Sequence, residues 1–445
     1  MAILNYDILN TICEYCSQTN LYKIRILSKK HHQVIKYLLV YDVYGLHNIN
    51  KHHHKIHLHY TDAPDVYHDR IWGLNIFCAN LKSLSENISK LRQLRTLYVT
   101  NNYMVSLTES IGELIQLEVL DVSHNKLTSF PKSIARLKRL KILKITHNEL
   151  QSFPEGVLEL KALQKLSLRN NNLASLPESI GELKQLIKLN VAFNKLVSLP
   201  EGIGGLTALR ELEIGKNQLI SLPESIGGLK ELRELFVYHS KIQSLPESIG
   251  QLNQLQMLYI SDNNLISLPE TIGGLKALQK LHAKRNQLTS LPDNIGALKQ
   301  LEILYVSGND LTSLPESIGQ LKQLQELDLD HNQLTLLPES IGGLEQLQRL
   351  YVGSNQLVSL PESICGLKLL LSLGVSDNRL TSLPESIGEL TQLLSLHISH
   401  NQLTTLPESI CELKQLTELL VSSNQLTPMS ENLASFLVAL NSRYD

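Results

Sequence analysis

The sequence predicts an α/β solenoid of about 16 stacked repeats with a parallel sheet on its concave side, preceded by a small all-α domain. Asparagine recurs every 23 residues from Asn102 to Asn424, with one step of 46 in which Ser240 occupies the asparagine position. Composition also changes before residue 71, where the period is absent and histidine and tyrosine are concentrated. A strict period of this length is the mark of a repeat array whose units share one continuous core.

Composition and charge exclude several other classes of protein. The 445 residues are 42% hydrophobic and 19% charged, which argues against a disordered chain. A net charge of -2 argues against a general nucleic-acid binder. Five cysteines are too few for a disulfide framework, and no apolar run is long enough to span a bilayer. The first residues lack the basic start of a signal peptide. We therefore expect an intracellular, cytoplasmic protein that binds no membrane.

Each repeat reads L-x-x-L-x-L-x-x-N-x-L-x-x-L-P-E-S-I-G-x-L-x-x, and the copy from Leu324 to Gln346 illustrates it. Alternating apolar residues, such as Leu327 and Leu329, predict a short strand with its leucines turned inward. Asn332 then turns the chain, and its amide can satisfy backbone groups there, so that stacked asparagines form a ladder.

The second half of the repeat predicts a short helical turn that returns to the core. Pro338 suits the start of such a turn, because its missing N–H would be unpaired there in any residue. Ile341 and Leu344 then face the core. A degenerate first unit precedes the regular ones, with Ala79 in the asparagine position. Its apolar residues in register are Ile71, Leu74, Ile76 and Leu81.

This pattern resembles that of leucine-rich repeat proteins over roughly 71–427, and its LPESIG form is similar to intracellular members of the Ras-scaffold and plant Ras-group types. The resemblance implies a curved leucine-rich repeat solenoid that binds another protein and needs capped ends. Residues 428–445 are expected to supply a capping helix with Ser430 as its N-cap. The apolar stripe of that helix comprises Leu433, Phe436, Leu437 and Leu440.

Residues 1–45 are predicted to form a separate helical domain, and 46–70 a histidine-rich linker or N-terminal cap. Three apolar sets keep helical spacing and predict three short helices. These sets are Ile8, Leu9, Ile12, Cys13 and Cys16, then Leu21, Ile24 and Leu27, then Val34, Ile35, Leu38 and Leu39.

The stretch from Leu4 to Tyr37 resembles an F-box, although Asn5 replaces the usual proline. The resemblance implies a substrate-recognition subunit of an SCF/cullin-type ubiquitin ligase, in which this segment binds a Skp-type adaptor and the repeats bind the protein substrate. The alternative is a plain cap on the first repeat, with the array acting as a scaffold or regulator of a small GTPase or another signalling protein. The adaptor-binding residues that the resemblance implies are Leu4, Ile8, Leu9, Ile12, Leu21 and Ile24.

One face of the predicted sheet is unusually aromatic. The residue between the second and third leucine positions points out of the concave sheet, and five of these fifteen positions carry Tyr or Phe, although the whole chain is only 5% aromatic. Basic and acidic residues also gather in separate repeats here, which would orient a partner. The alternative is that the tyrosines only stiffen the sheet. The partner-binding surface that we predict, within 232–360, comprises Phe236, Tyr238, Tyr259, His282, Lys284, Tyr305, Asp328, Asp330 and Tyr351.

Weaker signals give no further site. Cys13 and Cys16 form a C-x-x-C pair, but both occupy apolar positions of a predicted helix. His57 and His59 would share one face of a strand, yet no third ligand follows from spacing. Ser240 and Ala283 depart from the repeat pattern and could bend the array or reflect drift after duplication. No catalytic motif is present, so we expect neither an enzyme nor a cofactor.

Overall fold

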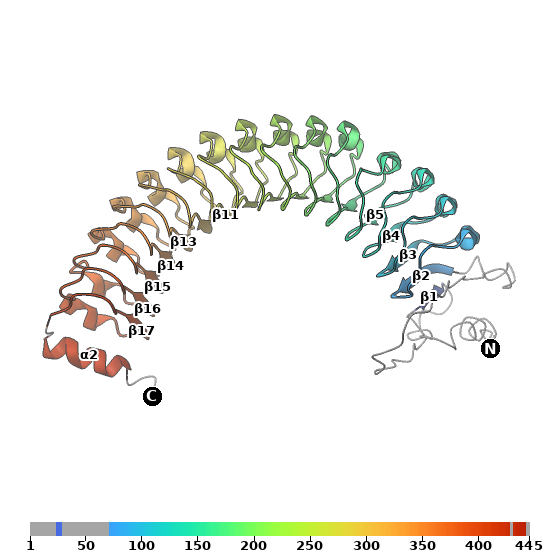
Figure 1. The fold of residues 1–445 in the computed structure, drawn as a ribbon. Helices are drawn as coiled ribbons and strands as arrows, with labels where there is room; N and C mark the ends of the chain where they lie inside the picture. Colours follow the sequence, from blue (N-terminus) through green and yellow to red (C-terminus); the bar gives the residue numbers. More distant parts are fainter. Residues whose placement is uncertain (1–23, 29–70, 428–429, 442–445) are drawn as a thin grey trace, which may run out of the picture. The chain divides into compact units, whose positions relative to one another are not determined.

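The computed structural model describes residues 24–28, 71–427 and 430–441, and these fall into two compact units, 1–209 and 210–445. Within each unit the regular repeats each contribute one short strand to the inner side and one 3-10 helical turn to the outer side (Figure 1). The concave sheet face is therefore the strand side of each unit.

The strands are short and parallel, apart from β1. In unit 1 they are β1 (Ile24–Ser28), β2 (Ile71–Phe77), β3 (Thr96–Thr100), β4 (Val119–Asp121), β5 (Ile142–Lys144), β6 (Lys165–Ser167) and β7 (Lys188–Asn190). In unit 2 they are β8 (Glu211–Glu213), β9 (Glu234–Phe236), β10 (Met257–Tyr259), β11 (Lys280–His282), β12 (Ile303–Tyr305), β13 (Glu326–Asp328), β14 (Arg349–Tyr351), β15 (Ser372–Gly374), β16 (Ser395–His397) and β17 (Glu418–Leu420).

The helical elements of the array are 3-10 turns, most of them five residues long. In unit 1 they are η3 (Glu86–Lys90), η4 (Glu109–Glu113), η5 (Lys132–Arg136), η6 (Glu155–Glu159), η7 (Glu178–Glu182) and η8 (Glu201–Gly205). In unit 2 they are η9 (Glu224–Gly228), η10 (Glu247–Gln251), η11 (Glu270–Gly274), η12 (Asp293–Ala297), η13 (Glu316–Gln320), η14 (Glu339–Gly343), η15 (Glu362–Gly366), η16 (Ile387–Glu389) and η17 (Glu408–Glu412).

The 23-residue period sets the register of the sheet. Leu258 lies opposite Leu281, and Leu281 lies opposite Leu304, so that equivalent leucines stack directly. These leucines are fully buried, as are Ile341 and Leu344 of the outer turn. The alternation of buried and partly exposed residues along each strand agrees with the period of two in the sequence. The predicted solenoid and its inward leucines are confirmed.

The asparagines form the expected ladder, in which their amides join adjacent repeats. Asn309 Oδ1 accepts from the Leu288 N–H at 3.0 Å, and its Nδ2 donates to the Ala283 carbonyl at 3.0 Å. A further bond of 2.9 Å reaches the Val306 carbonyl of its own repeat. At the degenerate end, Asn102 Oδ1 accepts from the N–H of Ala79 at 3.0 Å. The ladder satisfies backbone groups that would otherwise be buried without partners.

The outer turns begin after proline and are tied to one another by glutamate. Pro338 is the N-cap of η14, with its backbone still extended. Glu109 Oε2 of η4 accepts from the Ser133 N–H of η5 at 3.0 Å, and the Ser133 side chain, then this N–H, lower the pKa of Glu109. Glu178 Oε2 accepts in the same way from the Gly202 N–H at 2.8 Å. These glutamates therefore cap the turn of the next repeat.

The helical prediction for the N-terminal segment is wrong at Ile24–Ser28, which forms the strand β1. β1 pairs antiparallel with β2, with Ile26 opposite Leu74. This pairing supplies hydrogen-bond partners to the edge of β2, and the sequence IRILS is rich in β-branched residues. The other predicted residues of the segment lie outside the described residues; they are Leu4, Ile8, Leu9, Ile12, Cys13, Cys16, Leu21, Val34, Ile35, Leu38, Leu39, His57 and His59.

Unit 2 ends in the helix α2 (Glu431–Asn441), which contacts η17. Ser430 Oγ accepts from the Leu433 N–H at 3.2 Å, which is the hydrogen bond expected of an N-cap. Leu433 and Leu440 are buried, whereas Phe436 is partly buried. None of the helices in the described ranges combines the length and apolar character that crossing a membrane requires.

Candidate protein-binding surface

Four rings on successive strands of unit 2 stack into what we call the aromatic ladder: Phe236, Tyr259, His282 and Tyr305. Ring centroids lie 4.9 Å apart between Phe236 and Tyr259, 4.2 Å between Tyr259 and His282, and 4.6 Å between His282 and Tyr305. Each ring is partly buried by its neighbours and partly open on the concave sheet face. The packing between strands shows that the rings do stiffen the sheet, while their open surfaces remain able to contact a partner.

His282 is the constrained member of the ladder. Its Nε2 is buried and has no hydrogen-bond partner within the described part of the chain. Burial, together with the positive charges of Lys284 and Lys280, lowers the pKa of His282 to about 4. The imidazole is therefore neutral at physiological pH and contributes to the surface as an aromatic ring.

The lowered pKa of His282 predicts that mild acid weakens the ladder. An unfolded imidazole has an ordinary pKa of 6.5, so between pH 6.5 and 4 the unfolded chain binds a proton that the folded chain does not. The contribution of His282 to stability is complete above pH 6.5 and is lost as the pH falls towards 4. We expect the urea midpoint to fall more between pH 7 and pH 5 in the parent chain than in His282→Phe. An equal fall in both proteins would contradict this assignment.

The charges beyond the ladder are paired with one another rather than left open. Lys284 Nζ lies 2.6 Å from Asp328 Oδ2 and 4.1 Å from the centroid of the Tyr305 ring. The Tyr305 hydroxyl donates to Glu326, which also pairs with Arg349. Lys284, Asp328 and Glu326 are therefore paired within the sheet, and their role in orienting a partner stays a prediction. Their charges largely cancel within the sheet.

Asp330 has a structural contact of its own. Its Oδ1 accepts from the Gly353 N–H of the next repeat at 2.6 Å, and burial raises the pKa of its carboxyl group. This carboxylate is thus engaged in a hydrogen bond to the backbone of the array.

Glycines make room for the remaining two tyrosines. The ring of Tyr238 covers Gly215, where an added Cβ would lie 2.8 Å from a ring carbon, and the Tyr238 hydroxyl lies 3.4 Å from Glu213. The ring of Tyr351 lies beside Gly374, where an added Cβ would be 3.1 Å from the ring. A glycine at an outward-facing strand position is the sequence signal for such a contact, because it lets a neighbouring ring lie close to the backbone.

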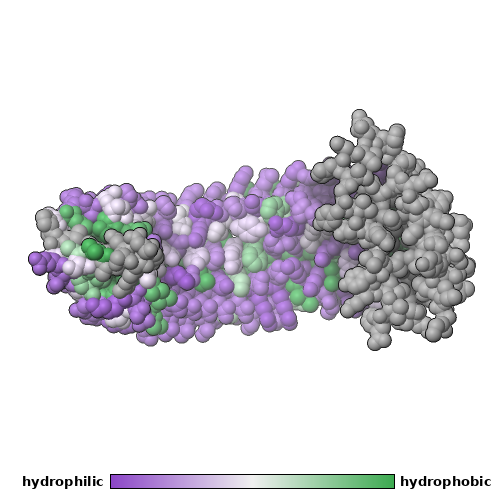
Figure 2. All heavy atoms as spheres, turned by 90° about the horizontal axis from the view of Figure 1, so that it is seen from below, coloured by the Kyte–Doolittle hydropathy of each residue, from purple (hydrophilic) through white to green (hydrophobic). Residues whose placement is uncertain are grey.

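The structure thus brings all nine predicted residues onto one face of unit 2. Figure 2 views the concave side, where paler and green atoms occupy the middle between purple rims. Glu326 and Arg349, which the prediction omits from the surface, belong to its charge network. Glu234 also lies on this face. It is a partly buried carboxylate at the start of β9, and after burial itself its negative charge contributes to the raised pKa of Tyr259.

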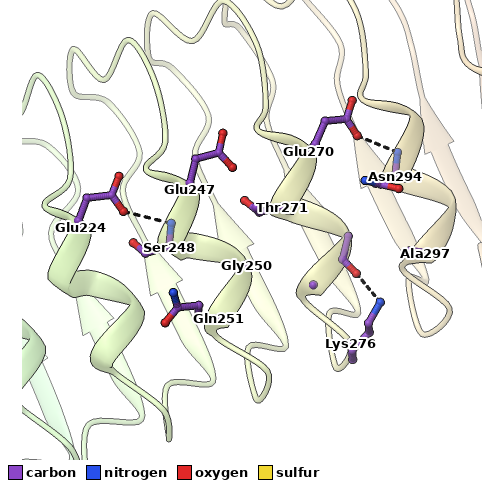
Figure 3. Close-up of a pocket in the computed structure, with 12 residues that line it drawn as sticks. Glu224, Glu247, Ser248, Gly250, Gln251, Glu270, Thr271, Lys276, Asn294 and Ala297 are labelled. Carbon is purple, nitrogen blue, oxygen red and sulfur yellow. Dashed lines mark hydrogen bonds between the residues drawn. The ribbon is translucent and has the colours of Figure 1, made fainter.

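A shallow groove lies on the opposite, outer side of unit 2 (Figure 3). It runs along the turns η9 to η12, and its polar groups are largely engaged. Glu224 accepts from the Ser248 N–H at 3.2 Å, and Lys276 donates to the Gly273 carbonyl at 2.6 Å. Because the groove is built from turn-capping contacts that recur along the array, we regard the concave face as the stronger candidate.

Comparison with known proteins agrees with this architecture. Residues 139–238 and 222–310 match the model of a leucine-rich repeat region. Residues 92–150, 299–357 and 368–426 match a leucine-rich repeat model. A solved leucine-rich repeat protein of Leptospira interrogans is 36% identical, with a TM-score of 0.75, and the match covers 83% of this chain and 93% of that chain. The chain belongs to the leucine-rich repeat family.

Other leucine-rich repeat structures are also similar. The plant peptide hormone receptor RGFR1, solved in complex with RGF2, is 33% identical with a TM-score of 0.69, over 80% of this chain and 59% of the receptor chain. YopM from Yersinia enterocolitica is 27% identical with a TM-score of 0.60, over 81% of this chain and 75% of that chain. A search of curated proteins finds no match. In the residues that the structure describes, no three metal-binding side chains gather into a potential metal site.

Proposed function

We propose that this leucine-rich repeat protein is a binding module, without a catalytic role, that captures another protein on the concave face of unit 2. The observation that carries the proposal is the aromatic ladder, which offers rigid, partly open rings on neighbouring strands. Rigid aromatic surface loses little conformational entropy on binding and is common among the residues that dominate protein interfaces. The similar receptor RGFR1 is described in complex with RGF2, which supports a partner-binding role for such a scaffold.

Removing two rings of the ladder should weaken capture strongly. We expect Tyr259→Ala combined with Tyr305→Ala to raise the Kd for the partner at least about tenfold, or about 1.4 kcal/mol. A photo-crosslinking residue at Tyr351 in the full chain would first identify the partner in a cell extract. Titration of the purified partner against both proteins then measures the change.

A matched control lies on the outer groove. Glu247→Ala combined with Lys276→Ala changes two exposed or partly exposed residues without touching the concave face, and should leave the Kd unchanged. Circular dichroism verifies that each variant remains folded. Equal binding by the ladder variant and the parent chain would refute the proposed surface.

A narrower proposal concerns the N-terminal segment. Its resemblance to an F-box supports a role as the substrate-recognition subunit of a cullin-type ubiquitin ligase in a eukaryotic cytoplasm, with the ladder holding the substrate. The strand β1 at Ile24–Ser28 argues against a wholly helical F-box, so the support rests on residues before it. Binding of a purified Skp-type adaptor to the full chain tests the idea, with Ile8→Asp and Leu9→Asp as the disrupting changes. If no adaptor binds, the repeat subtype favours a scaffold of small GTPases or other signalling proteins.

A further inference from the structure

The concave face of unit 2 carries an uneven charge from one end of the ladder to the other. The outward positions of β8 to β10 and of the residues just after them include three carboxylates and no lysine or arginine. These positions are Glu211, Glu213, Gly215, Glu234, Phe236, Tyr238, Met257, Tyr259 and Ser261.

The other end of the ladder shows how the chain neutralises such a site itself. There Lys284 lies over the Tyr305 ring and pairs with Asp328, so that one cation contacts both a ring face and a carboxylate. This arrangement is favourable because the ring quadrupole and the carboxylate attract the same positive charge.

At the Phe236 end the ring and the carboxylate are present, but no basic side chain of the described residues pairs with this carboxylate. Glu234 is partly buried beside the stacked rings of Phe236 and Tyr259, and within the described ranges it forms no ion pair or hydrogen bond through its carboxylate. Arg233 precedes it in the chain and is exposed, yet does not pair with it. A cation brought by a partner could pair with this carboxylate and contact the neighbouring rings at the same time.

We propose that Glu234, Phe236 and Tyr259, which we call the acidic corner, receive an arginine side chain of the bound protein. The proposal rests on the proposed function and specifies the chemistry of its partner. Arginine fits better than lysine because its planar guanidinium stacks on an aromatic ring and still donates hydrogen bonds in its plane to a carboxylate. The corner would thus hold an arginine at one end of the ladder, while the self-neutralised end makes mainly apolar contacts.

Short random peptides displayed on phage and selected on the full chain would test the proposal. We expect the selected peptides to share an arginine. Replacing that arginine with citrulline, which keeps the shape and removes the charge, should weaken binding to the parent chain about fivefold. On Glu234→Gln the same replacement should have almost no effect. Glu418→Gln, at the equivalent position of β17, should behave as the parent chain does.

The outcomes separate this proposal from the one on which it rests. Peptides that need Tyr259 and Tyr305 but contain no arginine, or that are insensitive to Glu234→Gln, would overturn the acidic corner and leave the binding face standing. Peptides whose binding is unaffected by Tyr259→Ala and Tyr305→Ala would overturn both proposals. Equal losses for Glu234→Gln and Glu418→Gln would show only a general charge effect and would also overturn the acidic corner.

Discussion

Replacing Asn309 with alanine should lower the free energy of unfolding by about 2–4 kcal/mol, because the side chain satisfies buried backbone groups of two repeats. It accepts from the Leu288 N–H and donates to the carbonyls of Ala283 and Val306, all at about 3 Å. Water cannot take its place, since the asparagine is buried with only 7% of its surface exposed. Alanine would therefore leave the Leu288 N–H without a partner in the core. It would also remove one of the two side-chain hydrogen bonds at each carbonyl, since Ala283 O also accepts from Asn286 and Val306 O from Asn332.

Denaturant unfolding of the full chain measures the loss, and hydrogen exchange at the Leu288 N–H locates it. Because each repeat contacts only its neighbours, opening should begin near the changed repeat instead of spreading evenly. Thr312→Ala, in the same repeat but on its surface, is the control. If Asn309→Ala and Thr312→Ala had the same denaturant midpoint, the asparagine ladder would be dispensable for stability.

Ser240 occupies the asparagine position of its repeat, so adding an asparagine there is the opposite test. The Ser240 Oγ is buried with no hydrogen-bond partner, and the Leu219 N–H, which an asparagine there would reach, has no acceptor among the described residues. Ser240→Asn should restore the bond and stabilise the array by about 1–2 kcal/mol. Such a gain would argue that Ser240 arose by drift. An unchanged denaturant midpoint would mean that the backbone near Ser240 does not allow the hydrogen bonds of the asparagine ladder.

The fold of the array can be predicted because the same 23-residue pattern recurs, and each copy predicts the same strand and turn. Strand register, the buried leucines and the asparagine ladder all depend on residues 23 apart, as the pairing of Leu281 with Leu304 shows. The segment before residue 71 offers no such repetition. There the spacing of Ile24 and Leu27 suits a helix, but pairing with the open edge of β2 favours a strand.

The surface was only partly predictable for a related reason. Alternation along a strand tells which side chains face outward, so the positions of Tyr259 and Tyr305 could be derived. Whether Lys284 meets Asp328 two strands away depends on rotamers and on the ring between them, and spacing does not encode these. That Glu234 lacks a partner cannot be predicted from one sequence either, because it is known only once the partners of the neighbouring charges are known.

Replacing Gly296 with alanine should destabilise unit 2 by about 1–3 kcal/mol, because the outer turns approach too closely to admit a methyl group. A Cβ at Gly296 in η12 would lie 2.5 Å from the Ser317 carbonyl oxygen of η13 and 2.9 Å from the Ser317 Cβ. Both contacts are to atoms close to the backbone, which cannot rotate away. Cys365 occupies the equivalent position, and the turn that follows, η16, is shortened to Ile387–Glu389.

Gly366 provides the matched control, since it lies in an outer turn but has space around it. An added Cβ there would meet nothing closer than the Gly342 carbonyl oxygen at 3.6 Å. Gly366→Ala should be neutral or stabilise by up to about 1 kcal/mol, through the smaller entropy of the unfolded chain. Thermal unfolding of the two variants distinguishes close stacking from a general need for glycine. If both changes cost the same, the glycines would serve backbone conformation, and the spacing of the outer turns would have to be set by the sheet alone.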